Sequence, residues 1–149
     1  VKIRRFPVVD EHGSFDIAVF AAAQALAGAC IIGAVKIWSP VCSKMLELQN
    51  GKEVHMKCFY AGQAAVIIGL ILLVIGVLAL INKSSSTGLL AVGAVCGIAL
   101  FLVFGDFIGV CGAEGMACRT TAVWGKVCGA IAVVAFAASI LTSKKGQIE

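Results

Sequence analysis

The sequence predicts an all-α integral membrane protein, a four-helix bundle that forms one domain over residues 1–149. Two observations support this fold class. First, 60% of the residues are hydrophobic and 13% are charged, and four long apolar runs fill most of the chain. Second, each run spans roughly 24–33 Å at 1.5 Å per residue, about the thickness of a bilayer core. The runs extend from Ile17 to Trp38, Ala61 to Ile81, Leu89 to Phe104 and Ala122 to Leu141.

The first predicted span covers residues 15–38 and follows an arm of residues 1–14. Trp38 is an amphipathic side chain that suits the membrane interface, and Ser39-Pro40 stops the helix. The apolar run is too long for the hydrophobic region of a signal peptide, so we expect the span to be retained.

The other three spans are predicted over residues 61–82, 88–105 and 122–142. The polar turn at residues 84–88 is too short to hold structure, so the second and third spans form a hairpin. The two longer connections, called here loop 1 (Ser39 to Tyr60) and loop 2 (Asp106 to Thr121), then lie together on the face opposite both termini.

The seven cysteines divide by location. Three lie inside predicted spans, where we expect small packing residues, and four lie in the two loops, two in each. An even number of cysteines in water-facing loops predicts disulfides in an oxidising compartment, and four reduced thiols in the cytosol are the alternative. The span cysteines are Cys30, Cys96 and Cys128, and the loop cysteines are Cys42, Cys58, Cys111 and Cys118.

The cysteines also orient the chain. Each face carries six Lys or Arg residues, so the positive-inside rule does not decide the orientation. If the loop cysteines form disulfides, both loops are extracytoplasmic and both termini are cytoplasmic. The sequence therefore predicts a multi-pass plasma membrane protein with its cysteine-bearing loops outside.

The two loops resemble each other. Loop 1 contains Val41-Cys42 and then Met56-Lys57-Cys58, and loop 2 contains Val110-Cys111 and then Met116-Ala117-Cys118. Each loop joins an outgoing span to a returning one. This pattern predicts two pseudo-repeated helical hairpins related by an axis along the membrane normal.

The repeat leaves two disulfide connectivities open. We favour the local pairs Cys42–Cys58 and Cys111–Cys118, because short loops close at lower entropic cost. If the two hairpins pack as a pseudo-symmetric pair, a cross-loop bond such as Cys42–Cys118 becomes the alternative.

These paired Cys…Met-x-Cys loops resemble those of a family of small four-span membrane proteins from bacteria and archaea, catalogued as a domain of unknown function. The resemblance covers all four spans and implies a prokaryotic plasma membrane protein, often encoded near transporter permeases. It offers no catalytic residues to carry over.

Small residues recur where the spans are expected to pack. Gly93 and Gly97 form a GxxxG motif in the third span, as do Gly125 and Gly129 in the fourth, and Gly33 has a similar place in the first. Such residues let helix backbones approach each other in lipid. Gln24 and Gln63 are the strongly polar side chains of the spans, and we expect interhelical hydrogen bonds from them.

The predicted function is a non-enzymatic accessory or structural subunit of a larger membrane complex, with disulfide-stapled outer loops. No Asp, Glu or Arg lies in mid-span, so no catalytic residue, cofactor or proton path is predicted. The expected partners are the lipid bilayer and other integral membrane subunits, either transporter permeases or copies of the same chain, and not nucleic acid.

Two alternatives remain open. One is a thiol–disulfide redox protein coupled to a membrane quinone, which needs a reactive loop disulfide. The other is soft-metal binding at the outer loops, where the cysteines, His55, Met56 and Met116 are ligands that suit Cu(I) or Zn(II).

Overall fold

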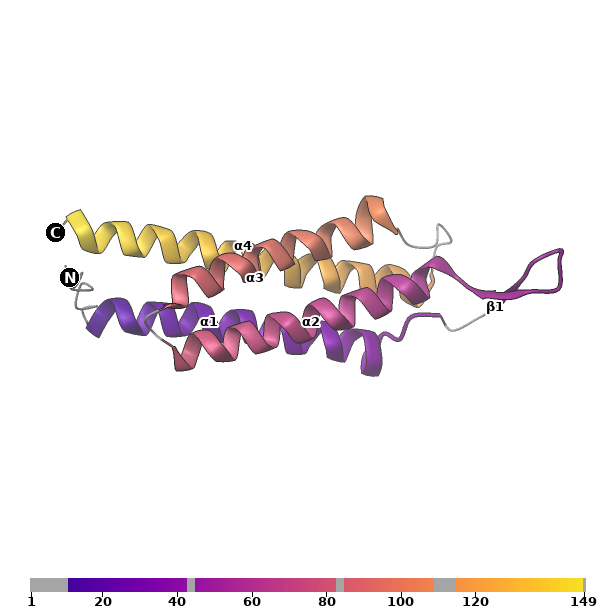
Figure 1. Cartoon of the computed structure of the whole chain (residues 1–149), viewed down its shortest axis with the longest axis horizontal. Helices are drawn as coiled ribbons and strands as arrows, with labels where there is room; N and C mark the ends of the chain where they lie inside the picture. Colours follow the sequence, from indigo (N-terminus) through magenta and orange to yellow (C-terminus); the bar gives the residue numbers. More distant parts are fainter. Residues whose placement is uncertain (1–10, 43–44, 83–84, 109–114, 149) are drawn as a thin grey trace, which may run out of the picture.

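The structure is an antiparallel bundle of four helices, and the fold class predicted from the sequence is confirmed (Figure 1). The computed structural model describes residues 11–42, 45–82, 85–108 and 115–148. Four helices are long and apolar enough to cross a membrane. The helices are α1 (Glu11–Gly33, continued by the π-helical segment η1, Ala34–Trp38), α2 (Lys57–Ile81), α3 (Ser86–Leu102, continued by η3, Val103–Phe107) and α4 (Ala117–Ile148).

The helices pack in a square, in which α1 and α3 each lie between α2 and α4. Large apolar side chains point outward from every helix, for example Leu26, Ile67, Val95 and Val134. Such a surface is costly in water and suits lipid acyl chains. The chain is therefore a multi-pass membrane protein whose two ends lie at the same end of the bundle (Figure 1).

Backbone contacts at small residues hold the helix pairs together. A Cβ atom added at Gly97 would lie 2.7 Å from the Gly129 carbonyl oxygen, and one added at Gly129 would lie 2.6 Å from the Gly97 oxygen. On the other side of the bundle, a Cβ at Gly28 would lie 2.6 Å from the oxygen of Gly69. The other glycines singled out in the sequence face side chains: Gly33 the Trp38 ring, Gly93 the Gln24 amide and Gly125 the Phe104 ring.

Gln24 is a fully buried polar side chain at the centre of the bundle. Its Nε2 donates hydrogen bonds to the backbone oxygens of Leu90 in α3 (3.1 Å) and Ala132 in α4 (3.5 Å). It therefore links α1 to both helices of the second hairpin, as expected of a polar group inside a span. Gln63, by contrast, is exposed on the surface of α2.

A short β hairpin extends past the ends of the helices along the long axis of the bundle (Figure 1). It consists of β1 (Met45–Glu47) and β2 (Glu53–His55), which pair antiparallel with Leu46 opposite Val54. The turn is closed by hydrogen bonds from Leu48 N to Lys52 O (3.0 Å) and from Gly51 N to Leu48 O (2.9 Å), with Gly51 at φ 71°. A left-handed Gly in the turn is common in short hairpin connections. Loop 1, predicted from the sequence as a connection between spans, therefore contains a pair of strands.

All four helices begin earlier than the sequence predicted, α1 at Glu11 rather than residue 15 and α3 at Ser86 rather than residue 88. α2 starts at Lys57 rather than residue 61, and α4 starts at Ala117 rather than residue 122. As a result, Cys58 and Cys118 each occupy the second position of a helix instead of lying in a loop. Their side chains therefore belong to the first turn of α2 and the first turn of α4.

Candidate functional site

Three cysteines from three separate parts of the chain converge at the end of the bundle opposite the termini. The Sγ atoms of Cys42, Cys58 and Cys118 all lie within 4.8 Å of one another, and we call this group the thiol cluster. The Cys118 thiol donates to Cys42 Sγ over 3.2 Å. Cys58 and Cys118 are each 1% exposed, whereas Cys42 is partly buried, so water has little access to the sulfur atoms.

Hydrogen bonds between the chain just before Cys42 and the first turn of α4 fix the distance between Cys42 and Cys118. Thr121 Oγ1 donates to the backbone oxygen of Ser39 over 2.5 Å. Ser39 Oγ donates in turn to the backbone oxygen of Ala117 over 3.1 Å and lies 3.1 Å from Thr121 Oγ1. Both hydroxyl side chains are buried, so these bonds hold Ala117, and with it Cys118, against the end of the first span.

A close contact with α2 brings Cys42 near Cys58. A Cβ atom added at Gly62 would lie 2.6 Å from Val41 Cγ2, so the glycine leaves room for the valine. Gly62 lies about one helical turn after Cys58, and Val41 directly precedes Cys42. The local sequence on both sides of the contact therefore positions the two thiols.

The two halves of the chain build this end of the bundle in the same way. The outgoing helices α1 and α3 each finish in a π-helical segment of five residues. The returning helices α2 and α4 each begin directly after a methionine, and Met56 O and Met116 O accept hydrogen bonds from Phe59 N (2.9 Å) and Arg119 N (3.1 Å). This correspondence agrees with the internal repeat predicted from the sequence.

The position of Cys58 and Cys118 also sets their electrostatic surroundings. The first turn of a helix carries backbone N–H groups without helical partners, and the helix dipole places a partial positive charge there. The helix ends therefore place partial positive charge beside both thiols, whereas their burial disfavours a negative sulfur.

His55 is not part of the thiol cluster. Among the described histidine, cysteine and carboxylate side chains, the group that can surround one ion comprises the three cysteines alone. His55 stacks on Phe59 with ring centroids 4.3 Å apart, Met56 is the residue that precedes α2, and Met116 is 37% exposed.

The predicted disulfides stay predictions. No disulfide joins two of the cysteines that the structure describes. Cys111 falls outside the described residues, so the local pair Cys111–Cys118 is not tested. The span cysteines pack as expected: Cys128 is part of the buried apolar core, and Cys30 and Cys96 pack against it.

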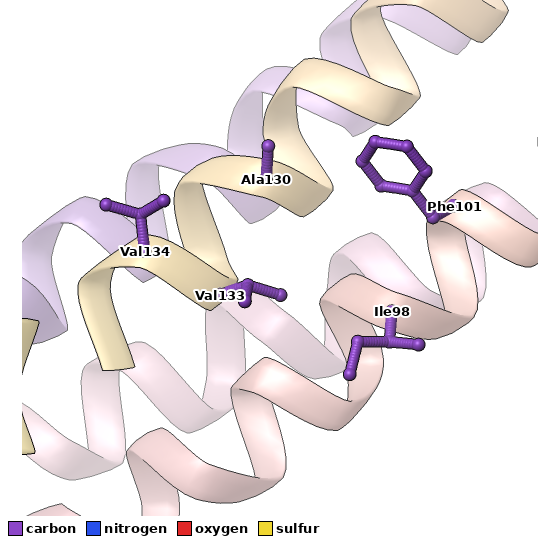
Figure 2. A pocket seen from close by; sticks show the side chains of 5 residues that line it. All are labelled: Ile98, Phe101, Ala130, Val133 and Val134. Carbon is purple, nitrogen blue, oxygen red and sulfur yellow. The ribbon is translucent and has the colours of Figure 1, made fainter. Parts of the chain in front are cut away.

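A groove on the outer surface between α3 and α4 is lined by apolar side chains alone, unlike the thiol cluster. It has a volume of about 440 Å³ and is lined by side chains of both helices, all of them apolar (Figure 2). These are Ile98, Phe101, Ala130, Val133 and Val134. With no polar group to orient a ligand, this groove resembles the rest of the lipid-facing surface.

Sequence reasoning missed the convergence of the three thiols and the hydroxyl bonds behind it. Cys42 and Cys118 are 76 residues apart, and their contact depends on which helices are neighbours in the bundle. The hairpin had a detectable signal, since Asn50-Gly51 stands between two stretches that alternate apolar and polar residues.

Comparison with known proteins assigns the chain to a family but does not indicate its chemistry. A family model described as a domain of unknown function (DUF4418) matches residues 24–143. No curated protein matches the chain, and no solved structure does.

Proposed function

Because the chain belongs to the DUF4418 family, whose description assigns no function, we propose its function from the geometry of the described residues. It is a non-enzymatic accessory subunit of a larger complex in the plasma membrane. Its β hairpin contacts the extramembrane part of an integral membrane partner. The observation that carries this proposal is the exposed apolar face of that hairpin.

The two faces of the hairpin differ in polarity. Successive side chains of a strand point to opposite faces, so Leu46 and Leu48 share a face with Val54. These three side chains are 52%, 51% and 41% exposed, respectively. The other face carries Met45, Glu47, Glu53 and His55.

This arrangement favours a protein partner. A two-stranded hairpin by itself is at best marginally stable in water, and a third strand or a packed face supports it. The hairpin extends along the bundle axis, past the helix ends and away from the plane of a membrane that the helices cross (Figure 1). Lipid therefore does not cover its apolar face, whereas another protein can. Burying the exposed half of each side chain contributes about 1 kcal/mol.

The polar face indicates the charge of the partner. Glu47 lies directly opposite Glu53 in the strand register, and like charges in this position destabilise a strand pair. A Lys or Arg side chain of the partner, placed between the two carboxylates, removes that repulsion.

Cross-linking in cells tests the proposal. An amine-reactive cross-linker applied to cells that express the full chain reports neighbours of Lys52, which is exposed in the hairpin turn. We expect cross-links from Lys52 to an extramembrane segment of another integral membrane protein. Cross-links only to copies of this chain, or none at all, contradict the proposed partner.

Two single variants at side chains of nearly equal exposure separate the faces. Leu46→Ser removes an apolar side chain that is 52% exposed and should weaken the cross-link, because contact area is lost. Met45→Ser is the matched control, since Met45 is 51% exposed on the opposite face. Equal loss in both variants would show that the apolar face is not what the partner binds.

A further inference from the structure

We propose that the thiol cluster binds one soft d10 metal ion, Cu(I) or Zn(II), through the Sγ atoms of Cys42, Cys58 and Cys118. This inference is independent of the hairpin and its partner. It assigns a ligand to the part of the molecule where three thiols converge.

The spacing of the sulfur atoms suits a single ion. Sulfur ligands at about 2.3 Å from a tetrahedral or trigonal ion are roughly 3.8–4.0 Å apart. The three Sγ atoms lie within 4.8 Å of one another, with Cys42 and Cys118 at 3.2 Å. For one ion to bind all three, the sulfur atoms of Cys42 and Cys118 must move apart from 3.2 Å to about 3.8 Å.

A single metal ion bound at the cluster uses all three thiols as ligands. Each cysteine is held by its own element: Cys42 by the Val41 contact with Gly62, and Cys118 by the hydrogen bonds of Thr121 and Ser39. Cys58 is fixed by its place in the first turn of α2.

The surroundings favour a bound cation with thiolate ligands. Burying three thiolates without a cation is costly, and a metal ion supplies the compensating charge as the thiols release their protons. The first turns of α2 and α4 add partial positive charge beside Cys58 and Cys118. They partly offset the negative charge that remains on the site.

The ligand set selects the kind of metal. Thiolates are soft ligands that select Cu(I) and Zn(II) over Mg(II) or Ca(II), which prefer oxygen. Three thiolates complete a trigonal Cu(I) site. Zn(II) takes a fourth ligand, and water suits that position as it does in open zinc sites.

Metal titration of the full chain tests the site. The protein is purified in mild detergent without oxygen, loaded with either Cu(I) or Zn(II), and titrated against a chromophoric chelator for each ion. We expect one ion per chain, and X-ray absorption at the metal edge should show a shell of three sulfur atoms. The metal content of the protein isolated from cells identifies the ion.

Single substitutions locate the ion. Cys58→Ser should weaken binding at least tenfold, and Cys96→Ser, which removes a partly buried thiol far from the cluster, should bind as the wild type does. The proposal is overturned if no ion is retained, if Cys58→Ser binds normally, or if both variants lose binding equally. It is also overturned if the protein isolated from cells carries a Cys42–Cys118 disulfide. Should Cys58→Ser fail to fold, the stoichiometry and sulfur shell of the wild type decide.

Discussion

Thr121 Oγ1 donates a buried hydrogen bond to the backbone oxygen of Ser39 over 2.5 Å, which joins the first turn of α4 to the end of the first span. The two residues lie 82 positions apart in the chain. Because Cys42 and Cys118 are close neighbours of this pair in sequence, the bond helps to set the distance between their thiols.

Removing this bond should loosen the thiol cluster. Thr121→Val keeps the size of the side chain but leaves the buried Ser39 backbone oxygen without its donor, at a cost of about 1–3 kcal/mol. Thermal unfolding in detergent measures the loss. Ser143→Ala, an exposed hydroxyl near the other end of α4, is the control and should change stability little. Equal stability of Thr121→Val and the wild type would contradict the structural role of the bond.

The close approach of α3 and α4 predicts a strong difference between two glycines of one helix. Gly97→Ala places a Cβ atom 2.7 Å from the Gly129 carbonyl oxygen, so the backbones must separate, at a cost of about 1–3 kcal/mol. Gly88→Ala, also in α3, meets nothing within 4 Å and should be neutral or slightly stabilising, because Ala favours the helix. Unfolding by a denaturing detergent compares the two. A smaller loss for Gly97→Ala than for Gly88→Ala would contradict this packing.

The four spans were predictable because a bilayer demands about twenty consecutive apolar residues, and few other structures need so many. The starts of α2 and α4 were not, since a helix can continue past its apolar run. Lys57 and Arg119 are ordinary helix residues that sit beyond the hydrophobic signal. Because the helices include these residues, Cys58 and Cys118 lie in the first turns of α2 and α4 and not in loops.

The thiol cluster was less predictable for a different reason. The sequence shows which cysteines lie at one face of the membrane, and sequence distance favoured pairs within a loop. The contact between Cys42 and Cys118 arises because α1 packs beside α4, and no local pattern reports that adjacency. The internal repeat was the useful signal. If the two hairpins pack as a pseudo-symmetric pair, Cys42 and Cys118 can be neighbours.

The orientation of the bundle is open to a labelling experiment. Asn50 lies in the hairpin turn and Ser85 lies between α2 and α3, and both are exposed at opposite ends of the bundle. With termini in the cytoplasm, an impermeant thiol reagent on intact cells should label Asn50→Cys and leave Ser85→Cys at the wild-type background. Labelling of Ser85→Cys alone would reverse the orientation.

The end of the first span and the start of α4 meet at the thiol cluster. Mild oxidation of the metal-free protein tests this contact most directly. Cys111→Ser is used so that this thiol does not compete, and the oxidised protein is digested and mapped by mass spectrometry. Because their sulfur atoms are 3.2 Å apart, Cys42 and Cys118 should form the main new disulfide. A map in which Cys42 is joined mainly to Cys58, or to neither cysteine, would contradict the account.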